Sequence, residues 1–261
     1  MTEPELSIII VSWNVKDLLK KCLESIFASQ GNFNSEVIVV DNASTDRTAE
    51  MVRVKFPQVK FLANEKNIGY AAANNLGFAQ SSGKYILFLN PDTVILDNTL
   101  EKMLEFVKGN DKIAIAGCKH LNPDKTLQPS IRRFPTVTAI VLILLKIAKI
   151  FPDLPALRHY FARDFDYNRL QIVDQVAGSF FFTKREILQK IGPFDEQFFT
   201  WFEEVDLCRR AKAAGWQVWY NPTAEIIHVG GQSFKQQLVL KNQKIFFQSA
   251  WRYFRKNGFG G

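Results

Sequence analysis

The stretch VVDNASTD, residues 39–46, is an apolar run that ends on Asp41 and then turns polar. A second stretch, LFLNPDT at residues 87–93, repeats this pattern and places Asp92 just beyond its apolar run. Continuous apolar, β-branched runs are typical of strands that are buried on both faces of a parallel sheet. Because ligands of such sheets bind beyond the carboxyl ends of the strands, the two aspartates predict a site at that edge.

The first half of the chain alternates such runs with segments of helical periodicity. Strands are expected at residues 6–13, 36–41, 59–64, 84–90 and 112–119, and helices at 15–29, 45–56, 70–81 and 98–109. Strands that alternate with helices in this way predict an α/β fold with a mostly parallel sheet, helices on its faces and right-handed crossovers.

The second half is less regular. Residues 120–135 read as a polar loop, residues 136–151 as one very apolar helix and residues 152–172 as irregular chain. Beyond them we expect a strand at 176–184, helices at 184–192 and 203–215, and strands at 216–220 and 224–229. From residue 233 the chain is basic and aromatic and reads as a helix. Because no repeat or low-complexity linker divides the chain, we expect one continuous domain over residues 1–261.

Composition narrows the classes of protein. The chain of 261 residues has three widely spaced cysteines and no CxxC pair, which argues against a disulfide framework or zinc site and fits a reducing cytosol. No run reaches the roughly 18 apolar residues that span a bilayer, and no secretory leader is expected. The net charge of +7 suits nucleic acid, an anionic membrane or a phosphorylated substrate. Nucleic acid is disfavoured, because the acidic strand ends repel phosphate unless a metal intervenes.

Six segments carry a resemblance to a known family. They are VVDNASTD (39–46), NIGYAAANN (67–75), LNPDT (89–93), AGSFFF (177–182), FDEQFFTWFEEVDLCRR (194–210) and IIHVGG (226–231). Together and in this order they resemble the nucleotide-sugar glycosyltransferases of family 2, in the rhamnosyltransferase-like branch, over roughly residues 5–232. The resemblance implies a GT-A fold with a nucleotide-sugar-binding half at about 5–119, an acceptor and catalytic half at about 120–232, and a basic aromatic tail at about 233–261.

For the donor side, the resemblance implies that the Asp41 carboxylate accepts a hydrogen bond from a uracil or thymine ring. The alternative is that Asp41 only caps a turn, a position that Asp and Asn favour. Asn42 is expected to shape that turn. Gly69 allows close backbone approach before a helix whose free N–H groups suit phosphate. The resemblance places Asn67, Gly69 and Asn74 along the nucleotide pocket.

The third segment departs from the family pattern. Relatives usually have Asp-x-Asp here, which binds a divalent cation and the donor diphosphate, whereas this chain has Asn90-Pro91-Asp92. Asp92 remains suited to Mg²⁺ or Mn²⁺, while Asn90 offers a neutral oxygen, so we expect weaker metal binding in the absence of donor. A plain Asn-Pro turn is the alternative. The resemblance implies that His228 is a further metal ligand, although a lone histidine is more often structural.

The general base is expected in the acidic segment. Thr200 and Glu203 have the spacing of a capping box, and Asp206 and Arg210 have the spacing of a pair on a helix surface. Glu204 has no such structural explanation. The resemblance implies that the second acid of this pair is the base, here Glu204 in place of the usual aspartate. Glu203 is the second candidate for the base. The alternative is that the acids have no catalytic role and only stabilise the helix dipole in the first turn.

Together with these expectations, the resemblance implies a metal-dependent, inverting glycosyltransferase of cell-surface polysaccharide synthesis. The resemblance favours rhamnose from dTDP-rhamnose, then a UDP-sugar, as donor, and a hydroxyl of a glycan or lipid-linked glycan as acceptor. The apolar residues 138–151 are either a core helix or an interfacial one that presents Lys146 and Lys149. Because many relatives act on lipid-linked sugars, the resemblance implies a cytoplasmic protein at the inner face of the membrane. Arg132 and Arg133 either contact a phosphate or are simply solvated.

Two other functions compete with this one. A sugar-phosphate nucleotidyltransferase also uses a parallel sheet, a nucleotide and a metal, but it needs a basic glycine-rich loop near the N-terminus, and VSWNVKDLL at 11–19 has no glycine. A non-catalytic sugar-nucleotide-binding protein is the second alternative. The presence of Asp41, Asp92, Glu204 and His228 together argues against it.

Overall fold

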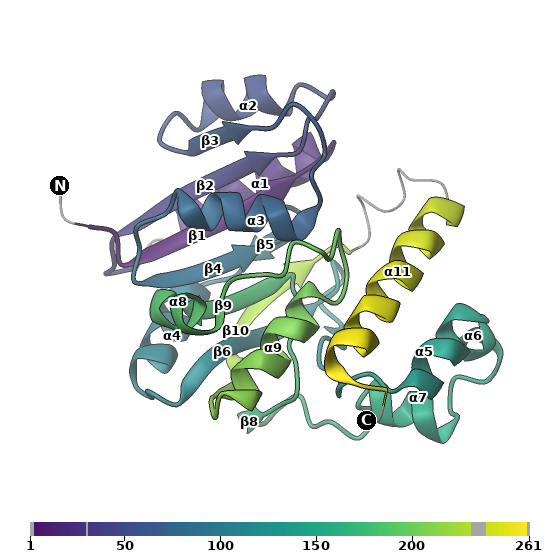
Figure 1. Cartoon of the computed structure of the whole chain (residues 1–261). Coiled ribbons are helices and arrows are strands. Elements are labelled where there is room, and N and C mark those ends of the chain that lie inside the picture. Colours follow the sequence, from purple (N-terminus) through teal and green to yellow (C-terminus); the bar gives the residue numbers. More distant parts are fainter. Residues whose placement is uncertain (1–2, 30, 231–238, 260–261) are drawn as a thin grey trace.

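Four strands in the first half of the computed structural model pair in parallel, as predicted (Figure 1). β1 (Leu6–Ser12) lies between β2 (Ser35–Asp41) and β4 (Tyr85–Leu89), and β3 (Lys60–Ala63) pairs with the other side of β2. Every residue of β1 is buried, as its continuous apolar run predicts. The pairing brings the carboxyl ends of β1, β2 and β4 to one edge of the sheet. The structure describes residues 3–29, 31–230 and 239–259.

The same sheet continues into the second half with mixed strand directions. Within the described residues its strand order is β3-β2-β1-β4-β9-β6-β10-β5. β9 pairs antiparallel with β4 and β6, β10 pairs parallel with β6, and β5 pairs antiparallel with β10. The remaining strands are β5 (Thr93–Ile95), β6 (Ile113–Leu121), β7 (Leu127–Gln128), β8 (Gln171–Ile172), β9 (Phe180–Lys184) and β10 (Gln217–His228).

The prediction of separate strands at 216–220 and 224–229 was wrong. They form the single strand β10, whose register against β6 shifts between Asn221 and Glu225. Pro222 lies in this gap, and a proline has no N–H for the ladder. The ladder is therefore interrupted there while the chain continues in the same direction, which gives the appearance of two strands in the sequence.

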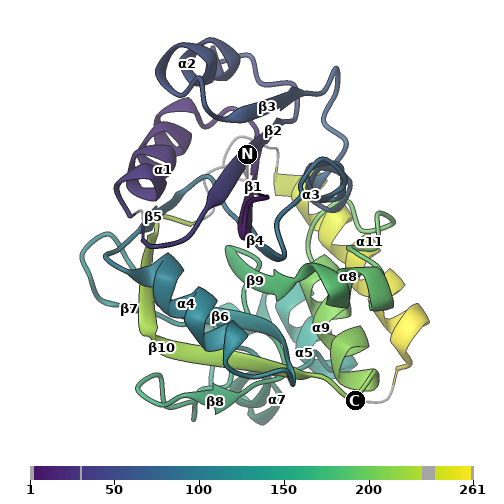
Figure 2. The ribbon, with the colours of Figure 1, turned by 90° about the vertical axis from the view of Figure 1, so that its left-hand side faces the viewer.

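Helices cover both faces of the sheet (Figure 2). The alternation of side chains along β1 places Ile8 and Ile10 in the cluster on one face and Ile9 in the cluster on the other. The first face packs against α1 (Lys16–Ala28), α2 (Thr48–Lys55) and α4 (Thr99–Lys108). The second packs against α3 (Tyr70–Ala79), α8 (Arg185–Ile191) and α9 (Glu203–Ala213).

A further helical cluster packs beside α9 and contains α5 (Val137–Leu144), α6 (Ile147–Ile150), α7 (Pro155–Tyr160) and α11 (Val239–Asn257) (Figure 1). One helix over 136–151 was predicted, and this was wrong. Lys146 has a φ of 59°, in the left-handed region, and separates α5 from α6. The predicted irregular stretch 152–172 contains α7. The predicted helical tail is confirmed for α11, whereas residues 233–238 lie outside the described part.

No helix in the described parts of the chain has both the length and the apolar character that crossing a bilayer requires.

Candidate active site

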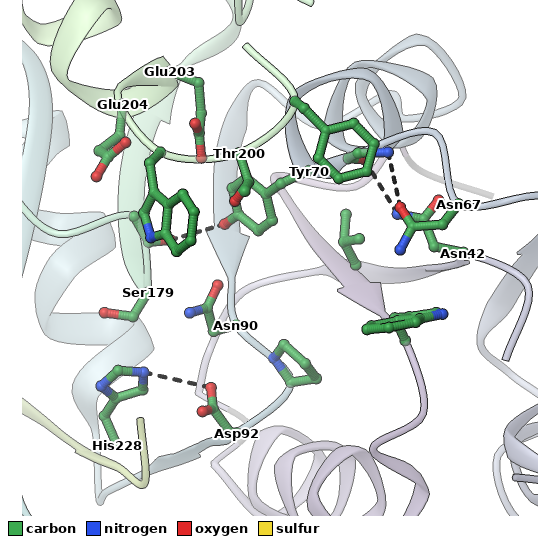
Figure 3. Close-up of a pocket in the computed structure, with 17 residues that line it drawn as sticks. Asn42, Asn67, Tyr70, Asn90, Asp92, Ser179, Thr200, Glu203, Glu204 and His228 are labelled. Atoms are coloured by element: carbon green, nitrogen blue, oxygen red, sulfur yellow. Dashed lines mark hydrogen bonds and ion pairs between the residues drawn. The ribbon is translucent and has the colours of Figure 1, made fainter. Parts of the chain in front are cut away.

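A cavity of about 250 Å³ opens at the edge of the sheet where the carboxyl ends of β1, β2 and β4 meet (Figure 3). Figure 3 shows Glu203 and Glu204 at one end of it, Asp92 and His228 at the other, and the Asn90 side chain between them. Most of the residues predicted for the site line this cavity. They are Asn42, Asn67, Gly69, Asn90, Asp92, Glu203, Glu204 and His228.

Asp41 and Asn74 are the predicted site residues that do not line the cavity. Asp41 is buried at the end of β2, where its Oδ2 accepts from the Ser44 backbone N–H at 2.9 Å. Its Oδ1 is buried without a hydrogen-bond partner among the described residues. Asn74 lies within α3 and donates from Nδ2 to the Tyr70 carbonyl. The turn role of Asp41 is therefore visible, and the base contact of Asp41 and the nucleotide contact of Asn74 stay predictions.

Two asparagines hold the loop before α3. Asn42 donates from Nδ2 to the Gly69 carbonyl at 3.1 Å, and the Asn67 side-chain oxygen accepts from the Gly69 N–H at 2.9 Å. Gly69 has a φ of +90°, and a Cβ there would lie 2.6 Å from the Phe199 carbonyl oxygen. The same carbonyl accepts from the Tyr70 N–H. The close backbone approach predicted for Gly69 is thus made to the segment that leads into α9.

Asp92 and His228 form the second feature of the cavity. The antiparallel pairing of β5 with β10 sets His228 opposite Thr93 and so beside Asp92. His228 Nε2 lies 3.4 Å from Asp92 Oδ1, and its Nδ1 lies 2.7 Å from Gln128 Oε1. The Gln128 amide is oriented by its Nε2, which donates to the carbonyl of His228 and to Asn122 Oδ1. Because an amide oxygen only accepts, the proton of neutral His228 is on Nδ1, and the Nε2 lone pair faces Asp92.

This donor set fits a divalent cation. The carboxylate oxygen suits Mg²⁺ or Mn²⁺, and an unprotonated imidazole nitrogen beside it is a common ligand of Mn²⁺-like ions. The described residues contain no group of three or more His, Cys, Asp or Glu side chains that could hold a metal. Asn90 adds a neutral amide in the cavity. Asp92 and His228 therefore need further oxygen ligands, of the kind that a diphosphate provides.

The chain enters α9 through two strained residues. Trp201 and Phe202 have φ values of 65° and 70°, in the left-handed region that costs a residue with a side chain roughly 1–3 kcal/mol. The aromatic ring of Phe202 packs on Tyr253 of α11 with 5.5 Å between ring centroids. The Thr200 carbonyl accepts from Ser249 Oγ, also on α11, at 2.9 Å. Packing against α11 therefore holds the turn that directs the following acids.

The predicted capping box was wrong. Helix α9 begins at Glu203 with Phe202 as the residue before it, and no side chain caps the helix. Glu203 is consequently in the first helical position and not in the third, and its side chain points into the cavity near Thr200 (Figure 3). The structural explanation that the spacing offered for Glu203 disappears, so both glutamates are free for chemistry.

Burial dominates the electrostatics of the glutamate pair. It raises the pKa of Glu203 well above its usual range, and the charge of the neighbouring Glu204 adds to the shift. Burial also raises the pKa of Glu204, while backbone hydrogen bonds and the Arg132 guanidinium oppose that rise. Each carboxyl group has a buried Oε2 without a hydrogen-bond partner among the described residues. The pair can therefore hold or accept a proton.

A second cavity of about 290 Å³ distinguishes the two glutamates. It shares Ser179, Glu204 and His228 with the first cavity, and it does not include Glu203. Ser179 is fixed at this junction by His120, whose Nε2 lies 2.8 Å from Ser179 Oγ. Burial, followed by the nearby His228, lowers the pKa of His120 to about 3, so its ring is neutral. Glu204 thus faces both cavities.

Sequence reasoning missed several residues of this site. Gln128 lies in the region predicted as a polar loop and contacts a residue 100 positions away, and no local pattern marks it. Tyr70 donates from its hydroxyl to the Gly178 carbonyl at 3.0 Å and closes the cavity wall. Ser179 lies in the segment AGSFFF, which contributed to the family resemblance, but the sequence assigned no function to this serine. The Asp206–Arg210 pair is present at 2.8 Å, but Asp206 is fully buried and also contacts Lys256 of α11.

Known proteins resemble this chain in sequence. The model of the family described as Glycosyl transferase family 2 matches residues 7–192. The N-acetylglucosaminyl-diphospho-decaprenol L-rhamnosyltransferase of Mycobacterium tuberculosis (strain CDC 1551 / Oshkosh) is 27% identical over 203 residues, which cover 74% of this chain and 66% of that protein. Rhamnosyltransferase WbbL of Escherichia coli (strain K12) is 27% identical over 261 residues, which cover 97% of this chain and 90% of WbbL.

Solved structures share its fold at low sequence identity. GalNAc-T7 with UDP, GalNAc and Mn²⁺ superposes with a TM-score of 0.64 at 15% identity, over 87% of this chain and 44% of that one. The mannosyltransferase PcManGT of Pyrobaculum calidifontis, in complex with GDP-Man and Mn²⁺, superposes with a TM-score of 0.59 at 14% identity, over 99% and 72%. The predicted GT-A fold is confirmed, and the chain belongs to glycosyl transferase family 2, with a rhamnosyltransferase-like sequence.

Proposed function

We propose that this protein is an inverting glycosyltransferase that transfers rhamnose from dTDP-rhamnose to a hydroxyl of a lipid-linked glycan during cell-surface polysaccharide synthesis. The observation that carries the proposal is the convergence of Asp92, His228 and Glu204 on one cavity at the carboxyl edge of the sheet. Family membership and the names of the M. tuberculosis and E. coli relatives support the choice of sugar.

The donor diphosphate binds at the end of the cavity that contains Asn90, Asp92 and His228. Asp92 and His228 would hold a divalent cation there, Mg²⁺ or Mn²⁺. When bound, this ion neutralises charge on the leaving nucleoside diphosphate. Gln128 keeps the imidazole proton on Nδ1, so that Nε2 remains a ligand. Asn42, Asn67 and Gly69 form the wall on the nucleoside side.

Glu204 is the general base of the proposed reaction. Its carboxylate accepts the proton of the acceptor hydroxyl while that oxygen forms a bond to the anomeric carbon. The bond from this carbon to the diphosphate oxygen breaks with its electron pair leaving on the diphosphate, and attack from the opposite side inverts the centre. Burial and the charge of Glu204 raise the pKa of Glu203, which favours its protonated form and a single negative charge on the pair.

The proposed function is tested by a screen of nucleotide sugars with the purified protein. Transfer to an N-acetylglucosaminyl-diphospho-prenol and slow hydrolysis are measured for dTDP-rhamnose, UDP-sugars and GDP-mannose, with Mn²⁺ and with EDTA. We expect transfer from dTDP-rhamnose that depends on the metal. Preference for a UDP-sugar would correct the donor, and the absence of transfer and hydrolysis with every donor would contradict the proposal.

The pH dependence of turnover follows from the buried glutamate pair. A base must be unprotonated, and burial raises the pKa of Glu204 above its ordinary value of 4.5. The value of kcat/KM is therefore expected to fall as the pH drops through a midpoint above 4.5, earlier than for an exposed glutamate. Initial rates in constant-ionic-strength buffers measure this limb. A midpoint at or below the ordinary value would contradict the buried-base assignment.

A membrane contact completes the proposal. The corner formed by residues 145–151, which contains α6, exposes Leu145, Ile150 and Phe151, with exposed fractions of 64%, 72% and 60%. Lys146 and Lys149 lie in the same corner. Apolar side chains interspersed with lysines suit the interface of an anionic bilayer, and each lysine near such a surface contributes about 1 kcal/mol. The relative named for a decaprenol-linked acceptor supports a substrate that resides in a membrane.

Replacement of Leu145, Ile150 and Phe151 by serine should abolish this contact. In flotation with phosphatidylglycerol-containing vesicles at low salt, we expect the wild type to float and the triple variant to remain at the bottom. Val54→Ser on α2 is the matched control, because Val54 is apolar and 74% exposed but has a different position in the fold. Equal flotation of the triple variant and the wild type would contradict the contact.

A further inference from the structure

The second cavity has an arginine without a carboxylate partner in its wall. Arg132 lies over the rings of Tyr160 and Phe161, with its guanidinium carbon 5.7 and 5.4 Å from their centroids. No carboxylate of the described residues forms a salt bridge with it, whereas the adjacent Arg133 pairs with Asp164 at 2.6 Å. The contact with two aromatic rings positions this exposed guanidinium and leaves its N–H groups available to a ligand.

The rest of the wall is polar and incompletely satisfied. Ser130 is 9% exposed, and its hydroxyl has no hydrogen-bond partner among the described residues. Gln175 is buried and donates from Nε2 to the Arg133 carbonyl, which fixes its amide beside the cavity. A buried hydroxyl without a partner costs free energy unless a ligand bonds to it. Ser130 and Arg132 thus offer hydrogen-bond donors to an anion.

The charge of Glu204 places that anion within the cavity. Arg132 lowers the pKa of Glu204, so the two side chains interact across the cavity that both line. A negatively charged group is repelled at the Glu204 end and attracted at the Arg132 end. An acceptor with a hydroxyl on one side and phosphate groups on the other satisfies both ends at once.

The position of Arg132 also agrees with a lipid-linked acceptor. Tyr160, under the guanidinium, belongs to α7, and α7 packs in one cluster with α5, whose end forms the apolar corner at Leu145. Phosphates held by Arg132 would therefore lie beside the helical cluster that also carries this corner. A chain attached to these phosphates has an apolar surface within the same helical cluster.

We infer that the second cavity is the acceptor subsite and that Arg132 binds the diphosphate that links the acceptor sugar to its lipid, which makes Arg132 a determinant of acceptor specificity. This inference rests on the proposed function for the identity of the acceptor. It predicts that the protein distinguishes a glycosyl diphosphate from the same glycosyl group without phosphate, and that it does so through Arg132.

Direct binding tests the inference without any turnover. Two water-soluble probes are compared by calorimetry in EDTA and without donor: N-acetylglucosaminyl diphosphate on a short prenyl chain, and the same prenyl N-acetylglucosaminide without the diphosphate. The wild type is expected to prefer the diphosphate, and Arg132→Gln is expected to bind it about 10- to 100-fold more weakly, as for the loss of a charged hydrogen bond. Binding of the neutral glycoside should not change, and Arg132→Lys should recover part of the loss.

The controls separate this inference from folding and from the proposed function. Arg163→Gln removes an arginine that is paired with Asp153 outside the cavity, and it should leave both affinities unchanged. Binding of nucleoside diphosphate with Mn²⁺ should be equal in Arg132→Gln and wild type, which verifies the fold and the donor side. Equal affinity of Arg132→Gln and wild type for the diphosphate probe would overturn the inference. So would binding of free pyrophosphate as tight as that of the glycosyl diphosphate.

Transfer assays then show which proposal has failed. Loss of all transfer in the wild type, with an Arg132-dependent preference for the diphosphate probe, would contradict the proposed function and leave the anion subsite. Transfer with an unchanged acceptor KM in Arg132→Gln would keep the function and remove the subsite.

Discussion

Glu204→Gln is expected to bind the donor as the wild type does and to lose turnover by about 10²- to 10⁴-fold, the usual contribution of a general base. The amide has the same shape but cannot accept the hydroxyl proton. Loss of the Glu204 carboxylate also removes a negative charge from a buried pair, so the substitution should not destabilise the fold. Calorimetry with dTDP and Mn²⁺ measures donor binding, and initial rates of transfer measure turnover.

Glu203→Gln is the matched control for this result. Glu203 is also buried, but it does not line the second cavity, and its raised pKa keeps it protonated in the proposed mechanism. We expect this variant to retain most of the turnover and the acid limb of the wild type. Loss of turnover in Glu203→Gln with wild-type rates in Glu204→Gln would assign the base to Glu203. Wild-type rates in both variants would place the base outside the pair.

Asp92→Ala is expected to lose metal-dependent donor binding. Asp92 Oδ1 lies 3.4 Å from His228 Nε2. Without the Asp92 carboxylate, His228 alone remains of this pair of proposed ligands. Loss of a residue that hydrogen-bonds to a metal ligand typically lowers metal affinity about 10- to 100-fold, so loss of a ligand itself should lower the affinity at least as much. The affinity for dTDP or UDP is measured with Mn²⁺ and with EDTA. Equal affinities of variant and wild type in Mn²⁺ would remove Asp92 from the metal site.

Asn90→Asp provides the opposite change in the same loop. It adds a second carboxylate to a cavity where the structure has a neutral amide, and it should tighten binding of Mn²⁺ in the absence of nucleotide. Electron paramagnetic resonance of free Mn²⁺ measures this affinity directly. No change in Asn90→Asp would show that the side chain at position 90 does not reach the cation.

Local sequence sufficed for the elements whose environment is uniform. β1 and β4 are buried throughout and β2 is buried from Val37 to Asp41, so their continuous apolar runs alone indicate strands of a parallel sheet. It failed where distant packing decides the conformation. The left-handed turn at Trp201 and Phe202 is held by α11, and it displaces the capping box that the letters TWFE suggest. The break between α5 and α6 at Lys146 could not be predicted, because no proline or glycine lies beside it in the sequence.

The candidate site shows the same division. The motifs predicted that Asp92, Glu204 and His228 belong to one site, because each lies at or beside the end of a strand or helix whose position the fold fixes. They did not predict Gln128. This residue contacts His228 from a strand of two residues, which is too short to show a periodic sequence pattern. Asp41 had a strong motif and still lies outside the cavity lining, which shows that a motif fixes a location more securely than a contact.

The link between α9 and α11 has a consequence for anyone who recombines such enzymes. Asp206, Thr200 and Phe202 all contact α11, through Lys256, Ser249 and Tyr253. The segment that carries the acidic pair and α11, the last helix of the chain, are thus packed as one unit. A hybrid that inherits its active-site acids from one parent and its C-terminus from another would lose the matched contacts that hold the turn before α9.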